Sequence, residues 1–313
     1  MDKLNILFHA TAGAPEQQWL AALNSALPDA DIRVWQEGDR APADFAIVWK
    51  PRAAMLAGRS DLKAIFNLGA GVDAILQLGD SLPAGVPVIR LDDAGMGAQM
   101  AEYVTQAVLS WYRRADEYEM QRRERRWQFL PPFAKADFSV GVLGLGVLGT
   151  QIAQALQAFD FPLHGWSRTR KTLAGVICHA GDAGLDTFLR ATKVLVCVLP
   201  LTADTRDILN AENLGKLQRG AYLVNVARGA HVVDADLLAL IATGQIAGAK
   251  LDVFREEPLP TAHPFWQEAR ISITPHISAL TQVDQSARQI ADKIQALKEG
   301  REIAGVVDFA KGY

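Results

Sequence analysis

An apolar run that leads directly into three spaced glycines constrains the fold of this 313-residue chain more than any other feature. Residues 139–143 read Ser-Val-Gly-Val-Leu, and Gly144, Gly146 and Gly149 follow with the spacing G-x-G-x-x-G. Residues 151–159 then have apolar side chains at helical spacing. In such a strand–turn–helix unit the first glycine permits the tight turn, the second admits a pyrophosphate, and the third lets the helix pack on the strand. The motif predicts a dinucleotide site.

The residues after the next predicted strand indicate which dinucleotide is bound. The helix start, including Val147 and Leu148, offers N–H groups to the phosphates. A second strand is expected at 162–166, and most NAD sites have Asp or Glu after it for the ribose 2′-hydroxyl. This chain has cations and hydroxyls there, which suit a 2′-phosphate. We therefore predict NADPH in preference to NADH; a solvated basic turn is the alternative. The expected phosphate ligands are Ser167, Arg168, Thr169, Arg170 and Lys171.

Composition excludes several classes of partner. A net charge of −3 gives no field that would favour nucleic acid or a membrane surface. No apolar run approaches the roughly 18 residues of a membrane span, and the first residues enter a strand pattern without the layout of a signal peptide. Cys178 and Cys197 lie in apolar sequence, which favours buried thiols over a disulfide. We expect a cytoplasmic protein that binds neither nucleic acid nor membrane.

Short β-branched runs alternate with helical patterns through most of the chain, which indicates βαβ units and an α/β fold. The nucleotide motif begins only near residue 139, so the preceding residues are expected to form a separate domain to which the last helix returns. We predict a substrate-binding domain at 1–98 plus 285–313. A dinucleotide-binding domain is predicted at 99–284, with a long helix over 97–127 at its start and a final helix over 281–298 after it. Further strands are expected at 5–9, 31–35, 45–49, 63–67, 86–90, 194–198, 222–226, 249–253 and 271–274.

Three ionisable groups follow three of these predicted strands. Reduction of a carbonyl needs a proton donor, a cation for a neighbouring carboxylate, and a group that orients the donor. His276 could be the proton donor and Arg228 the cation, and Glu256 or Glu257 could orient the donor. Because ligands bind open α/β sheets at the carboxyl ends of strands, we expect the three groups to converge. Each of them taken alone could equally be a surface charge.

Six ordered motifs carry a resemblance that covers nearly the whole chain. They are LGAGVD (68–73), GLGVLG (144–149), CVLPLT (197–202), NVARG (225–229), LDVF with EP (251–254 and 257–258), and TPH (274–276). The chain resembles the D-isomer-specific 2-hydroxyacid dehydrogenases. Residues 166–171 and the closing Gly312-Tyr313 are similar to members of this family that reduce glyoxylate and hydroxypyruvate. The Asp that this family usually has after the second nucleotide strand is missing here.

The resemblance implies roles for these residues. Arg228 would bind the substrate carboxylate and polarise the keto oxygen, and His276 would donate the proton. Glu257, which directly precedes the proline, would hold the other ring nitrogen of His276 and favour its imidazolium form. Ala70 and Gly71 would offer backbone N–H groups to the carboxylate. The expected neighbours of the nicotinamide are Leu199, Pro200, Thr205, Ala227 and Asp252. From its position after a strand, Trp49 is a candidate cap for a small substrate pocket; a core aromatic is the alternative.

The resemblance also implies two Rossmann-like domains with parallel sheets, an interdomain cleft, and NADPH-dependent reduction of a small 2-oxo acid such as glyoxylate or hydroxypyruvate. The helix near 98–126 would pair two copies into a homodimer, and Trp127 would reach the partner's site or pack in the interface. Another dehydrogenase of the same scaffold and a nucleotide-sensing binding protein remain as alternatives. A metal-dependent alcohol dehydrogenase is disfavoured because no zinc-ligand spacing is present, and no metal is predicted.

Overall fold

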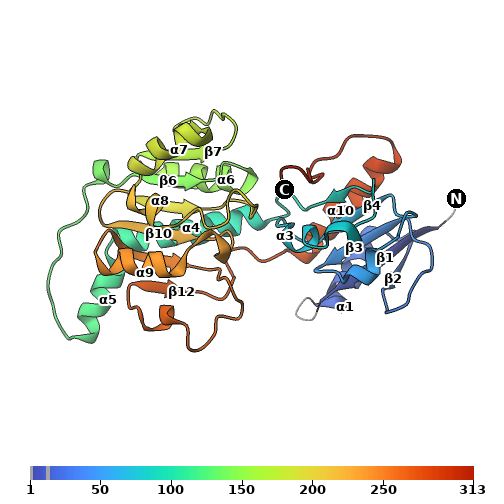
Figure 1. Cartoon of the computed structure of the whole chain (residues 1–313), viewed down its shortest axis with the longest axis horizontal. Helices are drawn as coiled ribbons and strands as arrows, with labels where there is room; N and C mark the ends of the chain where they lie inside the picture. Colours follow the sequence, from blue (N-terminus) through green and yellow to red (C-terminus); the bar gives the residue numbers. More distant parts are fainter. Residues whose placement is uncertain (1–2, 12–14) are drawn as a thin grey trace. The chain divides into compact units, whose positions relative to one another are not determined.

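The computed structural model describes residues 3–11 and 15–313. The chain forms two compact units. Unit 1 contains the chain up to Gly95 together with Thr281–Tyr313, and unit 2 is Met96–Leu280. The predicted boundaries, 98 and 284, lie three and four residues beyond these divisions. The expected α/β architecture is confirmed, since both units are built on parallel sheets flanked by helices (Figure 1).

Unit 1 is built on a five-stranded parallel sheet in the order β2-β1-β3-β4-β5. This is the flavodoxin-like order, in which the order of the strands along the sheet reverses between β1 and β3 while all strands stay parallel. All five strands were predicted, with shifts of up to two residues at their ends. The strands are β1 (Leu4–Ala10), β2 (Ala30–Val34), β3 (Phe45–Trp49), β4 (Ala64–Asn67) and β5 (Val88–Ile89).

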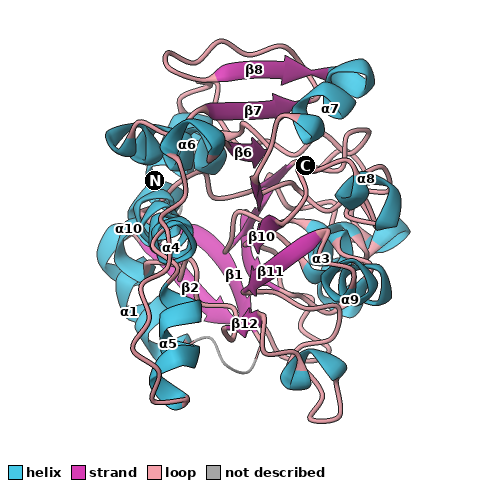
Figure 2. Ribbon diagram, turned by 90° about the vertical axis from the view of Figure 1, so that its left-hand side faces the viewer, coloured by secondary structure: helices cyan, strands magenta, loops and turns pink. Residues whose placement is uncertain are grey.

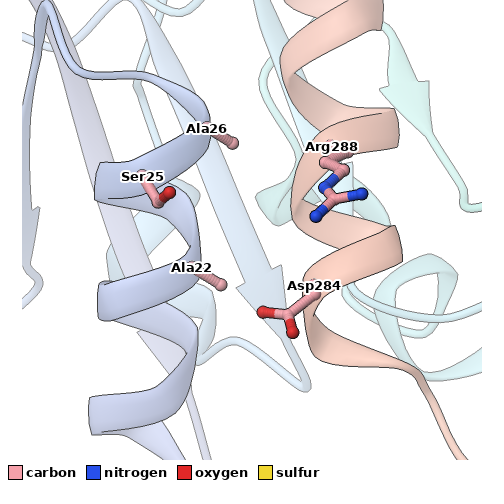
Figure 3. A pocket seen from close by; sticks show the side chains of 5 residues that line it. All are labelled: Ala22, Ser25, Ala26, Asp284 and Arg288. Atoms are coloured by element: carbon pink, nitrogen blue, oxygen red, sulfur yellow. The ribbon is translucent and has the colours of Figure 1, made fainter.

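The sheet of unit 1 is accompanied by short helices and two longer ones. The short helices α2 (Ala53–Leu56) and α3 (Asp73–Leu76) contribute Met55, Leu56 and Ile75 to a buried cluster with alternate strand residues. The longer helices α1 (Glu16–Ala26) and α10 (Val283–Lys298) lie side by side (Figure 3). A hollow of about 250 Å³ separates part of them. It is lined by Ala22, Ser25, Ala26, Asp284 and Arg288, and it includes no predicted site residue.

Unit 2 is built on a seven-stranded parallel sheet in the order β12-β11-β10-β9-β6-β7-β8. When β6 is numbered as the first strand and the sheet is read from β8, this is the dinucleotide-binding order 3-2-1-4-5-6 with β12 added at the far edge. The order of the strands along the sheet reverses between β6 and β9. Figure 2 shows β8, β7 and β6 side by side at one end of this sheet. The strands are β6 (Val140–Leu143), β7 (Leu163–Ser167), β8 (Ile177–Ala180), β9 (Val194–Cys197), β10 (Ala221–Asn225), β11 (Ile246–Leu251) and β12 (Ile271–Ile273).

The central strands β6, β9 and β10 are buried along their whole length, which explains why they read as nearly continuous apolar runs. Along β9, Val194 and Val196 pack with α4 and α6, whereas Leu195 and Cys197 pack with residues of α7, α8 and α9. The pleat alone sends alternate side chains to the two faces. The helices are α4 (Met96–Tyr112), α5 (Ala115–Arg123), α6 (Val147–Leu156), α7 (Gly181–Arg190), α8 (Ala211–Gly215) and α9 (Asp234–Ala242).

Two expectations were wrong in detail, and one strand was missed. The long helix predicted over 97–127 is two helices, because Arg114 adopts a left-handed conformation with φ of 58° between α4 and α5. The Arg114 guanidinium bonds Glu117 and the carbonyl of Pro131, and these contacts hold the break. Strand β8 was not predicted. Cys197 is fully buried, which raises the pKa of its thiol to about 12, but Cys178 is only partly buried.

No helix of the described chain is long and apolar enough to cross a membrane.

Candidate active site

The turn after β6 has the geometry that the glycine motif predicts. Gly144 has φ of +116°, which a side chain would disfavour. A Cβ on Gly149 would lie 1.8 Å from the carbonyl oxygen of Gly144, so only glycine permits this approach of α6 to the turn. Gly146 caps α6, and a Cβ there would meet no protein atom within 4 Å. The space beside Gly146 and the N-terminus of α6 therefore fits a dinucleotide phosphate, with Val147 and Leu148 in the first turn.

The basic turn after β7 is exposed, whereas Ser167, the last residue of β7, is buried. Ser167 is buried and its hydroxyl donates to the carbonyl of Thr169 at 2.8 Å, so this side chain shapes the turn. Arg168, Arg170 and Lys171 are exposed, as a 2′-phosphate site requires. Arg168 pairs with Asp204 at 3.6 Å, an acidic neighbour that no sequence pattern indicated. No carboxylate stands in the turn itself.

The loop after β9 is held by its own hydrogen bonds. Leu199 is buried, and Pro200 follows it with an exposed ring. Thr205 is buried, donates its hydroxyl to the carbonyl of Pro200 at 2.7 Å, and accepts the N–H of Thr202 at 2.8 Å. Thr205 thus fixes the shape of the loop that was predicted to lie along the nicotinamide.

Arg228 is presented by a tight loop after β10. The buried Asn225 holds this loop, since its side chain donates to the carbonyl of Arg228 at 3.1 Å and accepts the N–H of Ala227 at 3.1 Å. A Cβ on Gly229 would lie 1.9 Å from the carbonyl carbon of Phe254. Glycine at this position therefore lets the Arg228 loop pack directly on the segment that leads to Glu257.

His276 and Glu257 form the pair that the sequence suggested. Nδ1 of His276 lies 2.8 Å from Oε2 of Glu257, and the other carboxylate oxygen accepts the N–H of Phe254 at 3.0 Å. Burial raises the pKa of Glu257, but the bonds to His276 and Phe254 and the charges of His276 and Arg228 outweigh it, so the pKa lies below its usual value. Arg228, Glu257 and His276 are therefore electrostatically coupled. Glu256 is exposed beside them.

Asp252 is fully buried and organises the segment that carries His276. One carboxylate oxygen accepts the hydroxyl of Thr274 at 2.6 Å and the N–H of Ile277 at 2.9 Å, and the other accepts the N–H of Ser278 at 2.8 Å. The N–H of His276, whose φ is 55°, donates to the carbonyl of Asp252 at 2.9 Å. Asp252 thereby fixes the turn around His276; its predicted approach to the nicotinamide stays a prediction.

The predicted substrate residues of unit 1 also gather in one place. Trp49 ends β3, and its ring lies so close to Gly69 that a Cβ there would be 2.5 Å from the ring. The buried Asn67 donates to the carbonyls of Gly69 and Gly71 at 2.9 and 3.0 Å, which shapes the loop that contains Ala70. Sequence reasoning missed Asn67, although it is a polar residue at the carboxyl end of a strand.

Among the described residues, no group of three or more His, Cys, Asp or Glu side chains could hold a metal ion.

Comparison with known proteins identifies the scaffold. The model of the D-isomer specific 2-hydroxyacid dehydrogenase family, NAD binding domain, matches residues 105–278. The chain belongs to this family. A 2-hydroxyacid dehydrogenase relative, the glyoxylate/hydroxypyruvate reductase A of Yersinia enterocolitica, is 48% identical over 99% of this chain and 100% of the relative.

Solved structures of 2-hydroxyacid dehydrogenases superpose closely. One from Xanthobacter autotrophicus, in complex with NADPH and MES, is 40% identical, has a TM-score of 0.94 and covers 100% of both chains. The NADPH-dependent glyoxylate/hydroxypyruvate reductase of Sinorhizobium meliloti, in complex with NADP and sulfate, is 35% identical with a TM-score of 0.92. That match covers 99% of this chain and 100% of the other. The predicted family is confirmed.

Proposed function

We propose that this chain is an NADPH-dependent reductase of small 2-oxo acids, with glyoxylate and hydroxypyruvate as its substrates and glycolate and glycerate as the products. The observation that carries the proposal is the coupled set of Arg228, Glu257 and His276. The loops that carry them follow three adjacent strands of the dinucleotide-binding sheet. The names of the close relatives support the same reaction.

The three side chains divide the chemistry among them. Bound NADPH supplies a hydride to the carbonyl carbon. The guanidinium of Arg228 binds the substrate carboxylate and offsets the negative charge that develops on the keto oxygen. His276 gives that oxygen the proton on Nε2, since Nδ1 faces Glu257. Glu257 holds the ring orientation and stabilises the imidazolium before the proton is transferred.

The preference for NADPH is supported from two sides. The exposed cations Arg168, Arg170 and Lys171 suit the 2′-phosphate, with Arg168 and Arg170 as its main partners, and relatives of the same fold bind NADPH or NADP. Backbone N–H groups of Ala70 and Gly71 are proposed to bind the carboxylate of the substrate, and Trp49 to limit its size.

We also propose that the protein is a cytoplasmic homodimer. Tyr118, Trp127 and Phe129 line a hollow of about 470 Å³ beside α5, and the Trp127 side chain is fully exposed. Large exposed aromatics around one hollow are typical of an interface, here with a second copy of the chain. Trp127→Ser should shift the species measured by light scattering toward monomer. The free thiols of Cys178 and Cys197 support a reducing compartment.

A panel of 2-oxo acids, assayed by the loss of reduced cofactor with NADPH and NADH in parallel, tests the proposed reaction. We expect turnover of glyoxylate and hydroxypyruvate with NADPH, and His276→Ala should lower it by orders of magnitude while NADPH still binds. No turnover of any 2-oxo acid would refute the proposed function, and full activity of the variant would remove His276 from its role.

A further inference from the structure

His231 is a fully buried histidine that the proposed chemistry does not use. It lies three residues after Arg228, at the end of the short 3-10 helix Gly229–His231. Its Nδ1 is 3.2 Å from the backbone nitrogen of Arg228, and its Nε2 is 3.3 Å from the carbonyl oxygen of Pro200. One imidazole therefore contacts both the substrate-binding loop after β10 and the loop after β9 that is predicted to line the nicotinamide.

The contacts favour one tautomer of this ring. With the proton on Nε2, Nδ1 accepts the N–H of Arg228 and Nε2 donates to Pro200, so both ring nitrogens are used. With the proton on Nδ1, the ring donates instead to the carbonyl of Arg228 at 3.0 Å. That carbonyl already accepts the Asn225 side chain at 3.1 Å and the backbone N–H of His231 at 3.2 Å. The Nε2–H form thus satisfies more groups in this buried place.

The two hydrogen bonds of the His231 ring fix the distance between the Arg228 loop and the Pro200 loop. The carbonyl of Pro200 also accepts the hydroxyl of Thr205, so the ring is tied to the part of the loop that is already held. Hydrogen bonds shielded from water are stronger than exposed ones, and a fully buried ring has little freedom to move. An apolar side chain of similar volume would fill the space but would leave Arg228 and Pro200 unlinked.

We propose that His231 is a positioning residue that sets the Arg228 backbone against the Pro200 loop, and so places the carboxylate-binding guanidinium relative to the bound nicotinamide. The inference rests on the proposed function. It predicts that the two hydrogen bonds of the ring affect different ligands. Loss of the Nδ1 bond to Arg228 should weaken binding of the 2-oxo acid, and loss of the Nε2 bond to Pro200 should weaken binding of the cofactor.

Two substitutions separate the nitrogens. In His231→Asn the amide oxygen replaces Nδ1 near Arg228 but nothing reaches Pro200. We expect a KM for glyoxylate close to that of the parent, with NADPH bound about five-fold more weakly. In His231→Gln the amide nitrogen replaces Nε2 near Pro200 but Arg228 loses its acceptor. We expect a KM for glyoxylate about ten-fold higher, with NADPH binding close to that of the parent. His231→Leu should combine both losses.

The measurements are steady-state KM and kcat at saturating NADPH, and the Kd of NADPH from its fluorescence without substrate. His263→Asn is the matched control: Nδ1 of His263 also accepts a nearby backbone N–H, that of Phe265 at 3.3 Å, outside the Arg228 and Pro200 loops. It should change neither constant. Equal losses in the Asn and Gln variants, or none in any His231 variant, would overturn the inference.

A measurement on the unmodified protein tests the inference even if the His231 variants do not fold. Nitrogen chemical shifts of ¹⁵N-labelled histidine should show His231 as the neutral Nε2–H tautomer, and the Nδ1–H tautomer would overturn the inference. If the parent reduces no 2-oxo acid, the proposed function fails on that result alone. If the parent is active but the Asn and Gln variants do not separate, the role of His231 fails instead.

Discussion

Replacement of Glu257 by Gln removes the negative charge beside His276 and keeps the shape of the side chain. The two groups lie 2.8 Å apart, with 44% of the His276 side chain and 37% of the Glu257 side chain exposed. Two unit charges about 4 Å apart interact by about 4 kcal/mol at an effective dielectric of 20 and by about 1 kcal/mol in bulk water. Because solvent partly screens this half-exposed pair, we expect the protonated imidazole of His276 to lose about 1–2 kcal/mol of stabilisation when the carboxylate is removed.

That free energy sets the expected effect on catalysis. About 1.4 kcal/mol corresponds to a factor of ten in rate. Glu257→Gln should therefore lower kcat/KM for glyoxylate about ten-fold. The Kd of NADPH should stay unchanged, since the carboxylate acts on the imidazole ring.

The assay is kcat/KM for glyoxylate with NADPH, measured at one pH for the parent, Glu257→Gln and Glu256→Gln. The last variant is the matched control, because it removes the same charge one residue away, where the side chain is exposed. An unchanged kcat/KM in Glu257→Gln, or the same loss in both variants, would refute the reasoning that the direct bond to His276 carries the effect.

The other predictions concern the cofactor turn and stability. Uncharged residues at Arg168 and Arg170 should raise the Kd of NADPH roughly 10- to 100-fold and that of NADH less than about two-fold; fluorescence titration with both cofactors would show it, and equal losses would contradict the phosphate site. Asp204→Asn frees Arg168 from its ion pair and should tighten NADPH about two-fold in the same titration. Asp252→Asn places an amide NH₂ group, which is a donor, against the N–H of Ser278 in a buried place. Urea unfolding should therefore show a free energy of unfolding lower by about 2–4 kcal/mol. Because the pKa of Glu257 is lowered in the folded protein, its carboxylate contributes to stability, and this contribution is complete above the unfolded pKa of about 4.3. The contribution is lost as pH falls through the folded pKa, so the stability of Glu257→Gln should be less sensitive to acid over that window.

The parts of this molecule that could be predicted from the sequence are those with a local signature. The central strands β6, β9 and β10 are nearly continuous apolar runs. The G-x-G-x-x-G spacing identifies the turn after β6, where a side chain on Gly149 would clash with the carbonyl oxygen of Gly144. Arg228, Glu257 and His276 were found because each follows a predicted strand, and parallel strands bring their carboxyl ends to one edge. The break at Arg114 had no such signature, since neither glycine nor proline marks it.

The structural role of the polar residues that hold the site in shape had no signature of this kind, although Asp252 itself was expected beside the nicotinamide. Asn67, Asn225, His231 and Asp252 are buried, and each hydrogen-bonds atoms of a loop that carries a predicted site residue. In sequence they are single polar residues next to apolar runs, which could equally be solvated at a strand end. Only the folded structure shows that a buried amide, imidazole or carboxylate must find partners, and that the loop backbones are those partners. The groups that we propose as reactive can therefore be predicted from their positions after strands, whereas the precision of their placement depends on side chains whose partners are set by tertiary packing. On this argument, substitutions at the buried polar set should impair ligand binding even though none of these four side chains is assigned a contact with the 2-oxo acid.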